Sequence, residues 1–145
     1  GSDFSATPGT GAAGGLGFGL MAFAGATIES GFEVFAKATD LEAKVGEADF
    51  VVTAEGAIDE QTLMGKGTGQ VAALCRRLGK PCIGLAGQLA LGQAEVEPGR
   101  RLFWRLATLV PDLASEPEAM ANAASHLEQL AKREGILSRD TNFTD

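Results

Sequence analysis

The sequence predicts an α/β protein of three layers, in which helices cover both faces of a mostly parallel sheet. Residues 49–54 form a short, apolar run rich in β-branched residues, which is typical of a strand covered on both faces. A helical pattern over 68–78 and a second short apolar run over 81–86 follow it. A strand, a helix and a strand in this order form a βαβ unit, which requires parallel strands.

The segment before this unit predicts three helices. Apolar residues recur at helical spacing over 12–24, and Gly25 is placed to end that helix. Two short helices are expected next, one opening at Ser30 and one at Thr39. Each has a capping-box pattern, in which side chains satisfy the free N–H groups of the first turn.

The segments after each strand complete the predicted order of elements. We expect a polar loop over 55–65, and a helical turn over 88–94 once Gly87 has ended the second strand. A third strand is predicted over 106–110. The final helix is expected over 115–134, because it begins with a capping box and a proline in its first turn.

Three strands are few for a sheet of this kind, since sheets usually contain about four to six. A strand as apolar as 50–52 also needs a neighbour on each of its edges. We therefore expect the chain to be an incomplete part of a longer protein.

The composition excludes several classes of protein. With 12 Lys and Arg against 19 Asp and Glu, the formal net charge is −7, which disfavours nucleic acids and anionic membranes as partners. No apolar stretch reaches the roughly 18 residues of a membrane span, and we expect no secretory signal, since no charged segment followed by an apolar one stands at the start. Cys75 and Cys82 fit neither a disulfide framework nor a four-ligand metal site, so we expect buried thiols in a reducing cytoplasm.

A glycine-rich segment near the start allows three interpretations. Gly9, Gly11 and Gly14 have the spacing of a dinucleotide-binding fingerprint, but no strand precedes them as that motif requires. The glycines could instead allow close packing of a helix start against another element. A third possibility is that backbone N–H groups at Gly14 and Gly15 hold a phosphate or carboxylate.

The sequence Gly65-Lys66-Gly67-Thr68 resembles the end of a phosphate-binding loop, although Glu60 stands where that motif requires glycine. Lys66 and Thr68 still lie at the start of a predicted helix, where the helix dipole and free N–H groups favour an anion. The alternative is a solvated Lys66 and a Thr68 that only caps the helix.

The strongest group of candidate residues follows the first predicted strand. Glu55 and Asp59 leave its carboxyl end, where open α/β sheets place their ligands. Two acids beside a glycine could bind Mg²⁺ or accept a substrate proton, and the alternative is a pair of solvated loop carboxylates. We expect Glu55, Asp59 and Lys66 to be catalytic, with both acids as metal ligands. The expected substrate- or phosphate-binding residues are Gly14, Gly15, Gly56, Gln61, Thr62 and Thr68.

Several stretches together resemble the C-terminal part of bacterial glycerate kinases. They are Pro-Gly-Thr-Gly-Ala-Ala-Gly-Gly-Leu-Gly at 8–17, Thr-Ala-Glu-Gly-x-x-Asp-x-Gln-Thr-x-x-Gly-Lys at 53–66, and Ala-Gly at 86–87. Residues 119–123 fit the family's last helix as well. The resemblance extends over about 8–134 and implies a fold of two α/β domains, one of them assembled from both ends of a longer chain.

By this resemblance, residues 1–45 are the end of the inserted domain and the return crossing, and 46–136 are the C-terminal half of the split domain. Residues 137–145 carry no pattern and are expected to form a loose tail.

The resemblance implies ATP-dependent phosphorylation of D-glycerate to phosphoglycerate, with Mg²⁺, by a cytoplasmic kinase. The missing N-terminal part of the same enzyme would complete the active site, so this fragment alone is expected to be inactive. Two other functions stay open from the residues themselves. One is a noncatalytic α/β module that binds a nucleotide or a small acid, and the other is a structural fragment.

Overall fold

The computed structural model describes residues 3–65, 67–92 and 102–136 of the chain. It forms two compact units, Gly1–Thr39 and Asp40–Asp145. The predicted helical turn over 88–94 lies partly outside the described residues, and the predicted tail over 137–145 lies wholly outside them.

The first unit contains helices α1 (Ala12–Ala24) and α2 (Gly31–Thr39). Helix α1 forms where the sequence predicts it and ends at a left-handed Gly25. Its first turn is irregular, because Ala13, Gly14 and Gly15 have positive φ angles of 51°, 68° and 90°. The regular right-handed helix therefore begins after Gly15.

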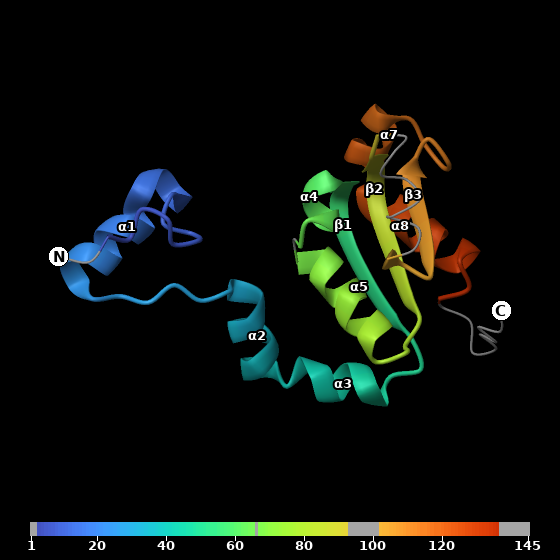
Figure 1. The fold of residues 1–145 in the computed structure, drawn as a ribbon. Helices are drawn as coiled ribbons and strands as arrows, with labels where there is room; N and C mark the ends of the chain where they lie inside the picture. Colours follow the sequence, from blue (N-terminus) through green and yellow to red (C-terminus); the bar gives the residue numbers. More distant parts are fainter. Residues whose placement is uncertain (1–2, 66, 93–101, 137–145) are drawn as a thin grey trace. The chain divides into compact units, whose positions relative to one another are not determined.

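The second unit is an α/β structure in which helices cover both faces of a parallel sheet, as predicted (Figure 1). Strands β1, β2 and β3 lie side by side in that order, and both pairings are parallel. Helix α5 packs against β1 and β2, whereas α7 and α8 pack against β3. The elements are α3 (Leu41–Glu47), β1 (Val51–Asp59), α4 (Glu60–Leu63), α5 (Gly67–Arg77), β2 (Cys82–Ala90), β3 (Arg105–Val110), α7 (Glu116–Ala121) and α8 (Ala123–Arg133).

Alternating residues of β2 supply two hydrophobic cores. Cys82 and Ala86 belong to the cluster that contains Cys75 of α5, and Ile83 and Leu85 belong to the cluster that contains Leu130 of α8. Because successive residues of a strand point to opposite faces, one continuous apolar run fills both cores. This explains why β2 lacks the polar alternation of a strand with one wet face.

Two predictions about the strand ends are wrong. Residues 55–59 belong to β1 instead of a loop, and 88–90 belong to β2 instead of a helical turn. Both strands continue because they pair with each other as far as Asp59. Gly87 does not end β2: it permits a close approach of the strands, since a Cβ there would lie 2.5 Å from the Gly56 carbonyl oxygen.

Three helix boundaries also differ from the prediction. The predicted final helix is divided into α7 and α8 at Asn122, which has φ −133° and ψ 38°, although the Ser115 capping box forms as predicted. Thr39 does not cap α3, because its hydroxyl donates to the Phe35 carbonyl oxygen. Helix α4 was expected to be part of a loop. Within the described part of the chain, no helix combines the length and apolar character needed to cross a bilayer.

Candidate functional site

The candidate site begins at the carboxyl end of β1, where the strand turns directly into α4. Asp59 is the N-cap of α4 and forms a reciprocal capping box with Thr62. The Thr62 N–H donates to Asp59 Oδ1 at 3.0 Å, and the Asp59 N–H donates to Thr62 Oγ1 at 3.3 Å. Two N–H groups at the helix start are thereby paired, which fixes the direction in which α4 leaves the strand.

Glu55 connects three elements through its carboxylate. The Thr62 hydroxyl of α4 and the Thr68 hydroxyl of α5 both donate to Glu55 Oε1, each at 2.5 Å. Glu55 and Thr68 are partly buried, and Thr62 is fully buried. The structure therefore brings together Glu55, Asp59, Thr62 and Thr68, all of which the sequence singled out.

Gly69 is an element of this site that sequence reasoning missed. A Cβ at Gly69 would overlap the Thr62 carbonyl oxygen, so the glycine is what lets α5 pack against the end of α4. An available signal was the position of Gly69 inside an otherwise strong helical pattern, where glycine normally weakens a helix.

The other predicted residues are located as follows. Gly56 is exposed in β1, and Gln61 is exposed on α4. Gly14 and Gly15 lie in the irregular first turn of α1, in the other compact unit, so they do not form the regular helix N-terminus on which the anion hypothesis relied. Lys66 lies outside the described residues.

An apolar cavity of about 420 Å³ opens on the α7–α8 side of the sheet and reaches Glu55 and Gly56. Its walls include Leu85, Leu109, Val110, Met120, Ala123 and Leu127. Sequence reasoning did not find this cavity. Its signal was the four alanines among residues 119–124, because small side chains leave space beside a sheet.

Glu55 and Asp59 are the residues of this site that could bind a magnesium ion. Among residues 3–65, 67–92 and 102–136, no group of three or more His, Cys, Asp or Glu could hold a metal ion. Mg²⁺ typically uses one or two protein carboxylates, with phosphate oxygens and water completing its octahedron. Glu55 and Asp59, which share Thr62 as a hydrogen-bond partner, could form such a pair.

The comparisons with known proteins agree on one family. The sequence profile of the glycerate kinase family matches residues 1–137. A glycerate kinase of Halalkalibacterium halodurans is 42% identical over 139 residues, which cover 95% of this chain and 36% of that protein. A glycerate kinase of Bacillus subtilis is 36% identical over 91% of this chain and 34% of its own length.

One solved structure extends this agreement to the fold. The crystal structure of a protein provisionally named glycerate kinase 2, from Salmonella typhimurium LT2, is 32% identical to the chain. It superposes with a TM-score of 0.53 over 90% of this chain and 33% of its own chain. The chain thus spans about a third of the length of the proteins that it matches.

Proposed function

The chain belongs to the glycerate kinase family, and on that premise we propose that the complete protein transfers a phosphoryl group from ATP to D-glycerate, with Mg²⁺, in the cytoplasm. The observation that carries the proposal is the pair of carboxylates at the carboxyl end of β1, fixed beside the start of α5. Catalysis of phosphoryl transfer is mainly the positioning of groups and the stabilisation of phosphate charge. Two acids at the carboxyl end of a strand, together with a helix N-terminus, supply groups for positioning the reactants and for stabilising phosphate charge.

We assign Glu55 and Asp59 to the metal and to the reacting glycerate hydroxyl. One carboxylate would accept the hydroxyl proton, which favours attack of that oxygen on the phosphorus. When bound, Mg²⁺ would supply positive charge at the nucleotide phosphates.

The start of α5 is assigned to an anionic group, either a phosphate or the glycerate carboxylate. The Thr68 hydroxyl proton is directed at Glu55, so an anion would meet the backbone N–H groups of the first turn instead. Lys66 precedes this turn in the sequence and is assigned to the same anion as a charge partner. As a separate proposal, Gly14 and Gly15 are assigned to backbone contacts with an anion through the irregular turn in which they lie, not through a regular helix N-terminus. Gly56 and Gln61 are assigned to contacts with substrate.

Two observations support the cytoplasmic assignment and a nucleotide substrate. Cys75 and Cys82 are free, buried thiols, as expected in a reducing compartment. The relatives named glycerate kinase support a phosphoryl donor, for which ATP is our proposal.

The test is charge removal at the two acids of the complete protein. Glu55→Gln and Asp59→Asn are each expected to lower the rate of glycerate-dependent ADP formation by at least about 100-fold. Neither change should unfold the site, because glutamine still accepts the threonine hydrogen bonds and asparagine is as good an N-cap as aspartate.

Magnesium titration separates the two roles, and Glu60→Gln is the matched control. Glu60 is the exposed acid next to Asp59, so its substitution should leave the rate unchanged. A variant that excess Mg²⁺ restores has lost a metal ligand, and a variant that it does not restore has lost the proton acceptor. Near-normal rates for both acid variants at low Mg²⁺ would show that the carboxyl end of β1 is not part of the catalytic centre.

A further inference from the structure

We propose that Thr62 is a positioning residue that holds Glu55 and Asp59 in a fixed relation, without touching the substrate itself. The inference rests on the proposed function, because these two acids are the ones assigned to the transfer. It gives Thr62 a role different from the ligand contact that the sequence suggested.

Burial is the first reason for this assignment. Thr62 is 0% exposed, and it is one of the most completely buried side chains among the described residues. A side chain with no accessible surface cannot contact a ligand directly. A buried hydroxyl is, however, costly unless it is hydrogen-bonded, so its partners define what it does.

The hydrogen bonds of Thr62 reach both acids at once. Its hydroxyl has one proton, which it donates to Glu55 Oε1 at 2.5 Å, and the same oxygen accepts the Asp59 N–H at 3.3 Å. Its own N–H donates to Asp59 Oδ1 at 3.0 Å. A separation of 3.4 Å between Thr62 Oγ1 and Asp59 Oδ1 leaves the hydroxyl proton directed at Glu55.

The backbone of Thr62 is itself held by the packing of α4 and α5. Its carbonyl oxygen accepts the Gly65 N–H at 3.2 Å and lies against Gly69, where a side chain would overlap it. The position of Thr62 is therefore set by the two helices, and it is transmitted to Glu55 by the hydroxyl and to the Asp59 carboxylate by the backbone N–H. Thr68, in contrast, is partly exposed and donates to Glu55 from the first turn of α5.

The test compares Thr62→Val with Thr62→Ser in the complete protein. Valine keeps the shape but loses the hydroxyl, whereas serine keeps the hydroxyl. We expect valine to lower kcat about 10- to 100-fold, as is typical when a group that orients a ligand is lost. KM for glycerate should change little, and serine should restore kcat.

Thr108→Val is the matched control, because Thr108 is also a buried threonine but lies on β3. It should leave kcat unchanged even if it lowers the melting temperature. A Thr62→Val protein that melts earlier but turns over normally, or a Thr62→Ser protein as slow as Thr62→Val, would overturn the proposal. If the valine variant does not fold, Thr62→Cys replaces it, because the cysteine S–H is only a weak hydrogen-bond donor. A normal kcat in the cysteine variant would also overturn the proposal.

A readout independent of activity separates this inference from the proposed function. In crystal structures, the Glu55 carboxylate should move away from residue 62 in Thr62→Val, where Thr68 is its remaining threonine donor, and return in Thr62→Ser. An unmoved carboxylate in the valine variant would overturn the positioning role. If the unmodified complete protein did not phosphorylate glycerate, the proposed function would fail, and this structural comparison would still decide the role of Thr62.

Discussion

At Gly69 the absence of a side chain decides how closely α5 approaches the end of α4. A Cβ at this position would overlap the Thr62 carbonyl oxygen, which is backbone and cannot rotate away. We expect Gly69→Ala to lower the free energy of unfolding by about 3 kcal/mol, the upper end of what overpacking usually costs. Gly67→Ala is the control, because nothing lies within 4 Å of a Cβ there. Urea unfolding measures both, and equal effects would mean that the contact is not tight.

The thiols of Cys75 and Cys82 face each other in the core between α5 and β2. Burial raises the pKa of both, and for Cys82 the neighbouring Cys75 raises it further. The folded protein therefore keeps these thiols protonated at a pH where the unfolded chain ionises them, since the ordinary pKa of cysteine is about 8.5. Their contribution to stability is complete below that pH and is lost as pH rises through the range between the unfolded and folded pKa values.

We predict that the free energy of unfolding falls between pH 8 and pH 10 in the presence of a reductant. Each thiol that stays protonated in the folded state lowers the free energy of unfolding by about 1.4 kcal/mol per pH unit above its unfolded pKa. Cys82→Ala should flatten this slope, since it removes one of the two ionising groups. The same slope in both proteins would show that other groups cause the pH dependence.

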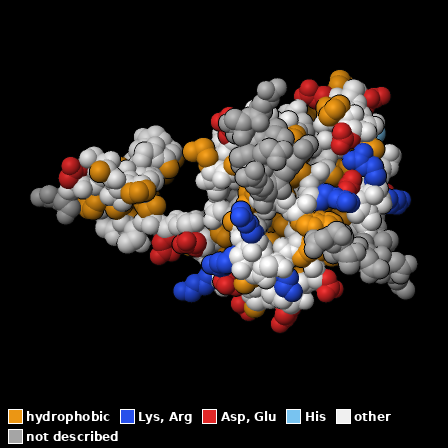
Figure 2. All heavy atoms as spheres, turned by 45° about the vertical axis from the view of Figure 1, so that its right-hand side comes forward, with side chains coloured by type: hydrophobic (Ala, Val, Ile, Leu, Met, Phe, Trp, Pro, Cys, Tyr) orange, Lys and Arg blue, Asp and Glu red, His pale blue; other side chains and the backbone are white. Residues whose placement is uncertain are grey.

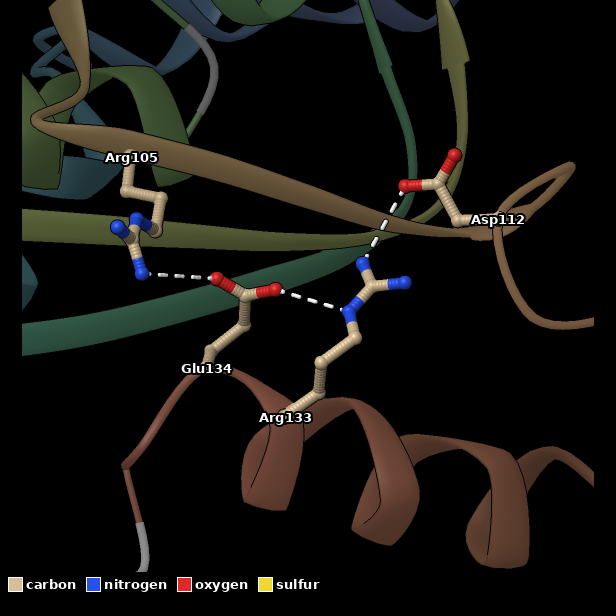
Figure 3. A network of polar contacts seen from close by, with 4 residues as sticks. All are labelled: Arg105, Asp112, Arg133 and Glu134. Atoms are coloured by element: carbon tan, nitrogen blue, oxygen red, sulfur yellow. Dashed lines mark hydrogen bonds and ion pairs between the residues drawn. The ribbon is translucent and has the colours of Figure 1, made fainter.

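Among the elements, the C-terminal end of α8 is connected to β3 by a network of ion pairs (Figure 3). Glu134 accepts from Arg105 of β3 at 3.2 Å and from Arg133 at 3.1 Å, and Arg133 also donates to Asp112 at 3.3 Å. The Glu134 side chain is only 11% exposed, so this pairing is screened less than an ordinary surface pair.

Glu134→Gln is expected to lower the free energy of unfolding by about 1 kcal/mol, the upper limit for pairs near the surface. Glu128→Gln is the control on the same helix, because Glu128 pairs only one turn away with Lys132 and is mostly exposed. It should have no measurable effect. Thermal unfolding at low and high salt tests the difference, which should shrink as salt rises; a difference that is absent or independent of salt contradicts the assignment.

The elements also show why part of the fold could be predicted and part could not. The order strand, helix, strand and the position of α5 follow from local periodicity, which sequence records directly. The extension of β1 and β2 through Gly56 and Gly87 cannot be predicted from local periodicity, because it depends on pairing between segments about thirty residues apart. Glycine favours a turn on average, but here it serves the close approach of two strands.

The same limit applies to the candidate site. Glu55, Asp59, Thr62 and Thr68 could be selected from the sequence, because acids and hydroxyls after a buried strand indicate chemistry. Which hydroxyl is buried and which carboxylate it orients depends on how α4 and α5 pack. That Thr62 connects Glu55 and Asp59 could therefore be seen only from the hydrogen bonds of the structure.

On the scale of the whole molecule, each of the two units exposes large apolar side chains among its described residues. Val52 of β1 is 39% exposed, and β2 is the one strand that pairs with β1 among the described residues. In the first unit the exposed large apolar side chains are Leu16, Phe18, Leu20, Phe23, Ile28, Val34 and Phe35. Figure 2 shows hydrophobic side chains at the surface of α1. An exposed edge and exposed apolar surface are typical of parts that another segment covers.

This surface, with the length of the relatives, leads to a prediction about activity. The 145-residue chain spans about a third of the glycerate kinases it matches, and phosphoryl transfer requires groups around the phosphates on more than one side. We expect the chain alone to form no ADP above background with ATP, glycerate and Mg²⁺. Co-expression with the remaining two thirds of a family member should restore turnover, because the added segments would cover β1 and close the site. Glycerate-dependent turnover by the isolated chain would instead mean that Glu55, Asp59 and the start of α5 are sufficient by themselves.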